Sequence, residues 1–174
     1  HPFKGSPDLL QLVPKTEEGG ATDGRDRYGF FKLSGYATLP TADDKERTDK
    51  SVHIGHKLDV RIGRESSKAP SDADGNCQWI LYPPEMKKLS RAAARIRWRP
   101  LKKVENLKGV ADGTPMEGSA WVLEATSSNV VVNRRLLNEN DNVVLKSRSA
   151  ISLGRGAVRL YFLLPREGSQ KPQQ

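Results

Sequence analysis

The chain has little of the chemistry on which catalysis and covalent cross-linking depend. Its single cysteine, Cys77, excludes an intramolecular disulfide and a multi-cysteine zinc site. Three histidines (His1, His53 and His56) leave little material for a metal centre or a catalytic triad. There is no glycine-rich phosphate loop of the Walker type. We therefore predict a protein that is not an enzyme, holds no metal or cofactor, and resides in a reducing compartment, the cytoplasm or nucleus.

Long hydrophobic runs are also missing, and charge of one sign is in excess. The longest apolar stretch has five residues, 160–164, far below the roughly 18 that a membrane span needs, so no membrane partner is expected. The chain has 29 Lys and Arg against 21 Asp and Glu, a net charge of +8. That surplus favours anionic partners, either phosphorylated or acidic protein or nucleic acid, without choosing among them. It predicts at least weak, salt-sensitive and non-specific attachment to nucleic acid.

The length of 174 residues suits one domain with tails. Residues 1–27 are rich in Pro, Gly and acidic residues and predict a flexible N-terminal lead-in. Residues 166–174 are polar and predict a disordered C-terminal tail. The domain itself is predicted over 28–165, and the oligomeric state is left open.

Short segments with period-2 hydrophobicity predict an all-β domain, a sandwich or a barrel. Leu58, Val60 and Ile62, for example, alternate with charged residues. The candidate strands are 28–39, 56–62, 77–82, 94–98, 121–125, 130–132, 142–145, 150–153 and 157–164. Polar segments at 41–51, 65–76 and 99–119 are predicted to be connections.

Residues 85–98 give a conflicting signal. They are strong helix formers, and Met86, Leu89, Ala93 and Ile96 lie near one helical face. Local propensity therefore predicts a basic amphipathic helix, which would suit a nucleic-acid-binding domain that inserts a helix into the major groove.

Three motifs follow one another along the body of the chain. A strand ends in a Gly-Arg step at Gly63 and Arg64, and a Ser-Arg pair follows at Ser90 and Arg91. A turn with the sequence SSN at 127–129 then leads through a strand to Asn133. This order and spacing, with the closing segment LKSRSAISLG at 145–154, resembles the forkhead-associated (FHA) domain over about 28–165.

The resemblance implies a two-sheet antiparallel β-sandwich that binds phosphothreonine peptides and mediates protein–protein interaction in signalling, with a nuclear location favoured. It implies that Arg64 and Ser90 hold phosphate oxygens, with Arg91 beside them. It implies that Ser127 or Ser128, with Asn129, holds the peptide backbone, and that Gly63 and Asn133 support the loops. A phosphate with about −1.5 to −2 charges suits an Arg and hydroxyl groups that converge from separate loops.

The chain departs from the family motifs at two places. Ala93 stands where the family has a His that braces the neighbouring loops. In the preferred alignment Ser128 replaces the Asn that grips the peptide, and Asn129 replaces a Gly, since Asn tolerates a positive φ. The other alignment makes Asn129 the gripping residue.

These departures predict weakened phosphothreonine binding or, as an alternative, a degenerate scaffold for unphosphorylated partners. Because three motifs agree and helix propensity is a weak indicator, we predict that Ser90 lies in a loop.

Overall fold

The computed structural model describes residues 29–66, 75–111 and 113–165. These residues form twelve strands and one short 3-10 helix at Leu101–Lys103, and no α-helix. The strands are β1 (Phe31–Pro40), β2 (Glu46–Gly55), β3 (Asp59–Arg64), β4 (Gln78–Tyr82), β5 (Ala94–Pro100), β6 (Leu107–Lys108), β7 (Ser119–Ala125), β8 (Val130–Val132), β9 (Arg135–Leu137), β10 (Asn142–Val144), β11 (Ser149–Leu153) and β12 (Val158–Leu163).

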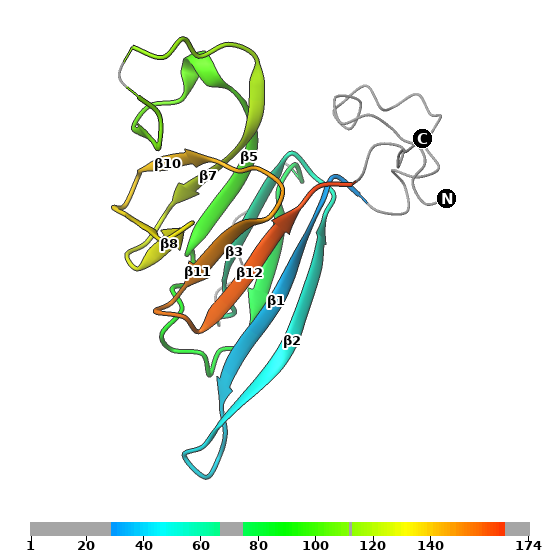
Figure 1. Ribbon diagram of the computed structural model, residues 1–174. Helices are drawn as coiled ribbons and strands as arrows, with labels where there is room; N and C mark the ends of the chain where they lie inside the picture. The colour runs from blue at the N-terminus through cyan, green and yellow to red at the C-terminus, as the bar shows by residue number, and fades with distance from the viewer. Residues whose placement is uncertain (1–28, 67–74, 112, 166–174) are drawn as a thin grey trace, which may run out of the picture.

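The strands form two sheets of six, so the predicted all-β sandwich is confirmed (Figure 1). The first sheet has the order β2-β1-β12-β11-β8-β9, and the second has the order β4-β3-β5-β7-β10-β6. Neighbouring strands are antiparallel except for the pairs β3–β4 and β6–β10, which are parallel.

The core lies between the sheets and is built from the inward-facing residues of both. Phe31 packs edge-on against Trp121 with ring centroids 4.9 Å apart, and lies 5.0 Å from Phe162. Leu33 and Leu123, from opposite sheets, are fully buried. The period-2 pattern that predicted the strands therefore marks the residues that hold the two sheets together.

The prediction of a connection at 41–51 is wrong over its second half, where β2 begins at Glu46. This strand pairs with β1 along its whole length, from Phe31↔Gly55 to Pro40↔Glu46. It lies at the edge of the first sheet, and only Ser51 and Gly55 are buried in it. Both faces of the projecting hairpin meet water, so β2 carries no hydrophobic alternation that could reveal it in the sequence.

The helix that propensity favours over 85–98 does not form. Residues 85–93 make turns, and β5 begins at Ala94. Leu89 and Ala93 are buried in the same core, and Arg95 and Arg97 pair with Asp59 and Glu124 on the neighbouring strands. Tertiary packing and cross-strand pairs therefore override local propensity here, and a major-groove helix is excluded.

A polar contact joins the two sheets near the edge formed by β2 and β4. The hydroxyl oxygens of Ser51 and Tyr82 are 2.7 Å apart, and His53 Nε2 lies 3.0 Å from Ser51 Oγ. The rings of His53 and Tyr82 meet edge to face with centroids 5.5 Å apart. Burial lowers the pKa of His53, and burial also raises the pKa of Tyr82 against the opposing effect of its hydrogen bond to Ser51.

The lowered pKa of His53 predicts a loss of stability in mild acid. The unfolded chain takes up a proton near the ordinary value of 6.5, whereas the folded chain resists it until lower pH. The free energy of unfolding should fall as the pH drops through 6.5 and level off below the lowered pKa. Urea unfolding between about pH 7.5 and pH 5.5 measures this. His53→Gln should flatten that dependence and His56→Gln, at an exposed position, should keep it; an unchanged slope in His53→Gln would contradict the assignment.

Candidate functional site

The strand register brings the three motifs to one end of the sandwich. In the second sheet Ile62 of β3 pairs with Ala94 of β5, and Ala94 pairs with Ala125 of β7. Because β5 runs antiparallel to both neighbours, the end of β3, the start of β5 and the end of β7 point the same way. Arg64, the loop before β5 and the turn after β7 therefore emerge side by side at one end of the second sheet.

The loop that carries Ser90 and Arg91 lies directly on the backbone of β3. The Arg64 amide donates to Ser90 O at 3.0 Å, and the Ala93 amide donates to Ile62 O at 2.8 Å. A Cβ at Gly63 would lie 1.8 Å from Arg91 O, a distance no side chain tolerates. Gly63 is therefore required for this close approach, which gives a physical reason for the supporting role that the sequence predicts for it.

The Arg64 side chain is held at one point and free at the other. Its Nε donates to Leu89 O at 2.9 Å, which fixes the direction of the guanidinium. Within the described ranges its terminal nitrogens have no hydrogen bond, and no carboxylate pairs with them. A half-buried guanidinium fixed in this way keeps donors available for an anion.

The turn after β7 is bonded to the loop before β5 rather than standing alone. The Thr126 amide and Ser127 Oγ both donate to Ala93 O, at 3.1 Å and 3.0 Å. Thr126 Oγ1 donates to Ala92 O at 2.9 Å. Thr126 was missed by the sequence analysis because nothing in the sequence shows which carbonyl its hydroxyl reaches. The Ser127 hydroxyl is therefore already hydrogen-bonded to the neighbouring loop.

Ser128 and Asn129 form the tip of this turn. Asn129 has a φ of 65°, the conformation that a Gly would adopt most easily, and its Nδ2 donates to the exposed Ser128 Oγ at 3.3 Å. A positive φ at Asn129 is what the preferred alignment requires, with Asn129 in the Gly position and Ser128 in the gripping position.

Asn133 ties the following hairpin to β11. Its Oδ1 accepts from the Ala150 amide at 2.8 Å, and its own amide donates to Ala150 O at 2.9 Å. Asn133 and Arg134 have φ values of 50° and 70°, which is the two-residue turn that joins β8 to β9. This geometry fixes β8 and therefore the turn that precedes it, consistent with the predicted bracing role.

Ala93 stands where the FHA motif has a histidine, and its backbone helps to hold the loop in shape. Its methyl group is buried in the core at 1% exposure, while its carbonyl accepts the bonds from Thr126 and Ser127. The expectation of a less ordered Ser90–Arg91 loop therefore does not follow from the missing imidazole, since main-chain contacts restrain the loop. Ser90 and Arg91 themselves are exposed, and Ser90 Oγ lies 3.3 Å from the amide nitrogen of Ala92.

Other kinds of site find no support in the described part of the chain. No cluster of three or more His, Cys, Asp or Glu residues occurs there that could hold a metal ion. Nor does any helix there have the length and hydropathy that a membrane span needs.

Comparison with solved structures shows a likeness to FHA domains, as the motifs predicted. The chain is similar to the MEK1 FHA domain in complex with a HOP1 phosphothreonine peptide, with 17% identity and a TM-score of 0.41 over 78% of this chain and 97% of that one. It is similar to full-length yeast Pml1p, with 13% identity and a TM-score of 0.45 over 92% and 99%. It is similar to the yeast Dun1 FHA domain in complex with a doubly phosphorylated peptide, with 16% identity and a TM-score of 0.43 over 90% and 87%.

No protein-family model matches the chain, and no curated protein matches it in sequence. At these identities the likeness to solved structures concerns the fold.

Alanine substitutions of the two serines in the turn, Ser127 and Ser128, are predicted to have different effects on stability. Ser127→Ala removes the hydroxyl that binds Ala93 O and should lower the free energy of unfolding by about 1 kcal/mol. Ser128→Ala, the matched control, removes an exposed hydroxyl that only accepts from Asn129 and should cost less than about 0.5 kcal/mol. Chemical denaturation of the free protein measures both. Equal losses would show that the turn is not tied to the loop through Ser127.

Proposed function

We propose that the chain is a non-catalytic module that binds phosphorylated protein segments, with phosphothreonine as its preferred residue. The observation that carries the proposal is Arg64, whose guanidinium is oriented by Leu89 O while its terminal donors stay free. It stands beside the loop before β5, which is bonded to β3 on one side and to the turn after β7 on the other. A rigid cation framed by exposed hydroxyl groups is the arrangement that a phosphate requires.

The proposal gives each residue of the site a part in recognition. Arg64 and the Ser90 hydroxyl hold phosphate oxygens, and the exposed guanidinium of Arg91 adds charge beside them. Ser128 and Asn129, at the tip of the turn, hold the peptide backbone. Ser127 positions that turn instead of touching the ligand, because its hydroxyl already serves Ala93 O. Two of the similar solved structures hold phosphorylated peptides, and the same class of ligand is proposed for this chain.

Binding is proposed to be weaker than in a site with an Asn at position 128. A carboxamide both donates to and accepts from a peptide backbone, whereas the Ser128 hydroxyl is shorter and already accepts from Asn129. One missing hydrogen bond of about 1 kcal/mol corresponds to roughly a fivefold loss of affinity. We also propose a signalling role in the nucleus or cytoplasm. A scaffold for unphosphorylated partners is the alternative that the binding experiment below decides.

Arg64→Ala should abolish most phosphopeptide binding. Loss of a charge-assisted hydrogen bond of about 1.5–3 kcal/mol predicts a fall in affinity of roughly ten- to a hundredfold or more. Titration of phosphothreonine, phosphoserine and unphosphorylated peptide libraries measures it. Lys102→Ala is the matched control, since it removes one positive charge beyond the opposite end of β5. Equal binding of unphosphorylated peptides, or no effect of Arg64→Ala, would favour the scaffold alternative.

Ser128→Asn should raise phosphopeptide affinity about fivefold, because it restores a carboxamide that can donate and accept at the peptide backbone. The change is made alone, since Ala93→His would force an imidazole into a fully buried core position. The same peptide titration measures the effect, with Ser127→Asn as the neighbouring control. If Ser127→Asn strengthens binding and Ser128→Asn does not, the alignment of the turn is wrong.

A further inference from the structure

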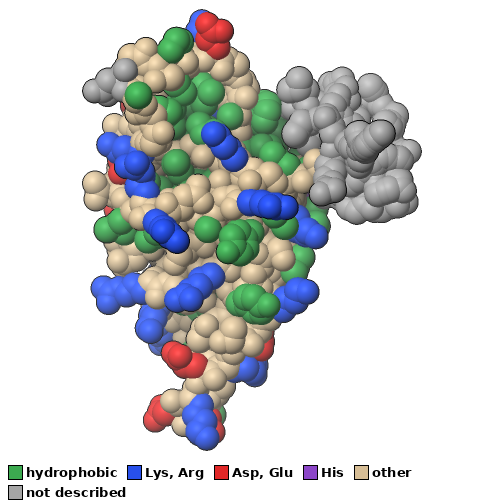
Figure 2. All heavy atoms as spheres, in the orientation of Figure 1, with side chains coloured by type: hydrophobic (Ala, Val, Ile, Leu, Met, Phe, Trp, Pro, Cys, Tyr) green, Lys and Arg blue, Asp and Glu red, His purple; other side chains and the backbone are tan. Residues whose placement is uncertain are grey.

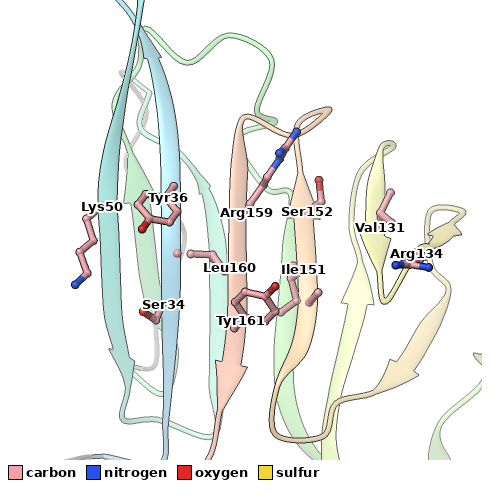
Figure 3. Close-up of a pocket in the computed structure, with 12 residues that line it drawn as sticks. Ser34, Tyr36, Lys50, Val131, Arg134, Ile151, Ser152, Arg159, Leu160 and Tyr161 are labelled. Atoms are coloured by element: carbon pink, nitrogen blue, oxygen red, sulfur yellow. The ribbon is translucent and has the colours of Figure 1, made fainter.

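The outer face of the first sheet carries a groove of about 570 Å³ that the proposed phosphopeptide site does not use. Small residues form part of it, and two tyrosines stand in it, Tyr36 on β1 and Tyr161 on β12, which are 58% and 55% exposed. Figure 3 shows the two rings on neighbouring strands, with Lys50 and Arg159 close by. Exposed rings of this size on a sheet face are candidates for contact with a ligand.

The strand register places these residues in a regular array. Tyr36 lies opposite Lys50 of β2 on one side and opposite Arg159 of β12 on the other, and Arg159 lies opposite Ser152. Tyr161 lies opposite Ser34, two residues along from Tyr36, so the tyrosines are diagonal neighbours. Diagonal positions of an antiparallel pair are about 7–8 Å apart. Within the described residues neither tyrosine ring packs against another aromatic ring.

Positive charge surrounds the tyrosines and continues past them. Lys50, Arg134 and Arg159 line the groove, and none of its lining residues is acidic. A separate groove of about 510 Å³ is lined by residues from both sheets, including Val132 of β8 and Val143 of β10, and shares no lining residue with the first groove. Arg135, Lys146 and Arg148 line it, again with no acidic residue. Figure 2 shows blue side chains around green ones across the middle of this face.

Most of these cations differ from Arg95 and Arg97 of the second sheet in having no acidic partner. On the second sheet Arg95 pairs with Asp59 at 2.8 Å, and Arg97 pairs with Glu124 at 3.0 Å. Among the described residues no carboxylate lies within ion-pair distance of six of the seven groove cations, Lys50, Arg134, Arg135, Lys146, Arg148 and Arg159. The seventh, Lys108, lies 3.9 Å from Asp141. The positive charge on the first sheet is therefore available to an external polyanion.

Two of these arginines occupy backbone positions that suit glycine better. Arg134 has a φ of 70° and Arg148 a φ of 80°, and both line the grooves. The left-handed conformation is costly for an L side chain. Each of these arginines therefore places a cation in a groove although its backbone conformation is strained.

We propose that this face binds single-stranded nucleic acid, with bases stacked on Tyr36 and Tyr161 and phosphates held by Lys50, Arg134 and Arg159 of the first groove. Stacking on aromatic rings along a positively charged groove is how proteins bind single strands without sequence preference. An acidic peptide would pair with the cations, but its carboxylates would not stack on the two tyrosine rings. A single phosphate would occupy one or two of the cations, whereas a strand spans the whole row.

Fluorescence anisotropy with labelled oligo(U) and oligo(dT) of about 12 nucleotides tests the proposal. Tyr36→Ala and Tyr161→Ala should each lower affinity at least about fivefold, and the Phe variants should retain it because the ring is kept. The ratio between the two probes shows whether the ribose hydroxyl contributes. Arg64→Ala should leave this binding unchanged, which separates it from the phosphopeptide site.

The charge variant and its control are both at arginines with a positive φ, so each change to glycine relieves the same kind of backbone strain. Arg134→Gly relieves strain while removing a cation of the first groove, so the fold is kept, and it should reduce the slope of log affinity against log salt by roughly 0.7. Arg155→Gly, at a φ of 59° outside both grooves, is the control and should change neither affinity nor slope. Duplex DNA bound as tightly as the single strands, with no effect of the tyrosine changes, would overturn the proposal. Tyrosine-dependent binding of a polyglutamate peptide with equal affinity would also overturn it, in favour of an acidic protein segment.

Discussion

The contact between the end of β3 and the loop before β5 is the constraint on which the candidate site depends. Only a residue without a side chain allows Arg91 O to lie where a Cβ of Gly63 would stand. That approach lets the Arg64 amide bind Ser90 O, and it places Leu89 O within reach of Arg64 Nε. One glycine therefore both orients the guanidinium and positions the loop that shares the site with it.

Hydrogen bonds to the carbonyl of Ala93 take the place of the histidine side chain that the motif would have at position 93. A histidine braces loops through its side chain, whereas this chain buries a methyl group there and uses the carbonyl of Ala93 as the acceptor for Thr126 and Ser127. The order of the loop is preserved by main-chain acceptors at Ala92 and Ala93 that receive bonds from the Thr126 amide and from the hydroxyls of Thr126 and Ser127. The departure from the family motif thus changes which atoms hold the loop and does not remove the support.

The sequence predicted those parts of the fold in which side chains alternate between core and solvent. Strands such as β8, found at 130–132 as expected, bury Val130 and Val132 on one face. It could not predict β2, whose outer half projects into water, or the turns at 85–93, where burial of Leu89 outweighs helix propensity. For the site, it could predict that the loops carrying the motifs lie at one end of the sandwich, because the motifs sit at strand ends. It could not show that the Ser127 hydroxyl is already engaged, since a hydrogen bond to a main-chain carbonyl leaves no mark on the sequence.

The net charge of +8 does not show where the excess positive charge lies on the surface. The ion pairs show which cations have an acidic partner and which do not. Arg61 and Arg95 share Asp59 on the second sheet, so one of their two positive charges is balanced by that carboxylate. On the first sheet and its edge, Arg134 and Arg159 have no such partner among the described residues, and they line the same groove as the exposed Tyr36 and Tyr161. Equal composition on the two faces would give no preference for where an anion binds. The unequal distribution of carboxylates is the reason that we propose two separate places for negative charge, a single phosphate at Arg64 and an extended polyanion across β1 and β12.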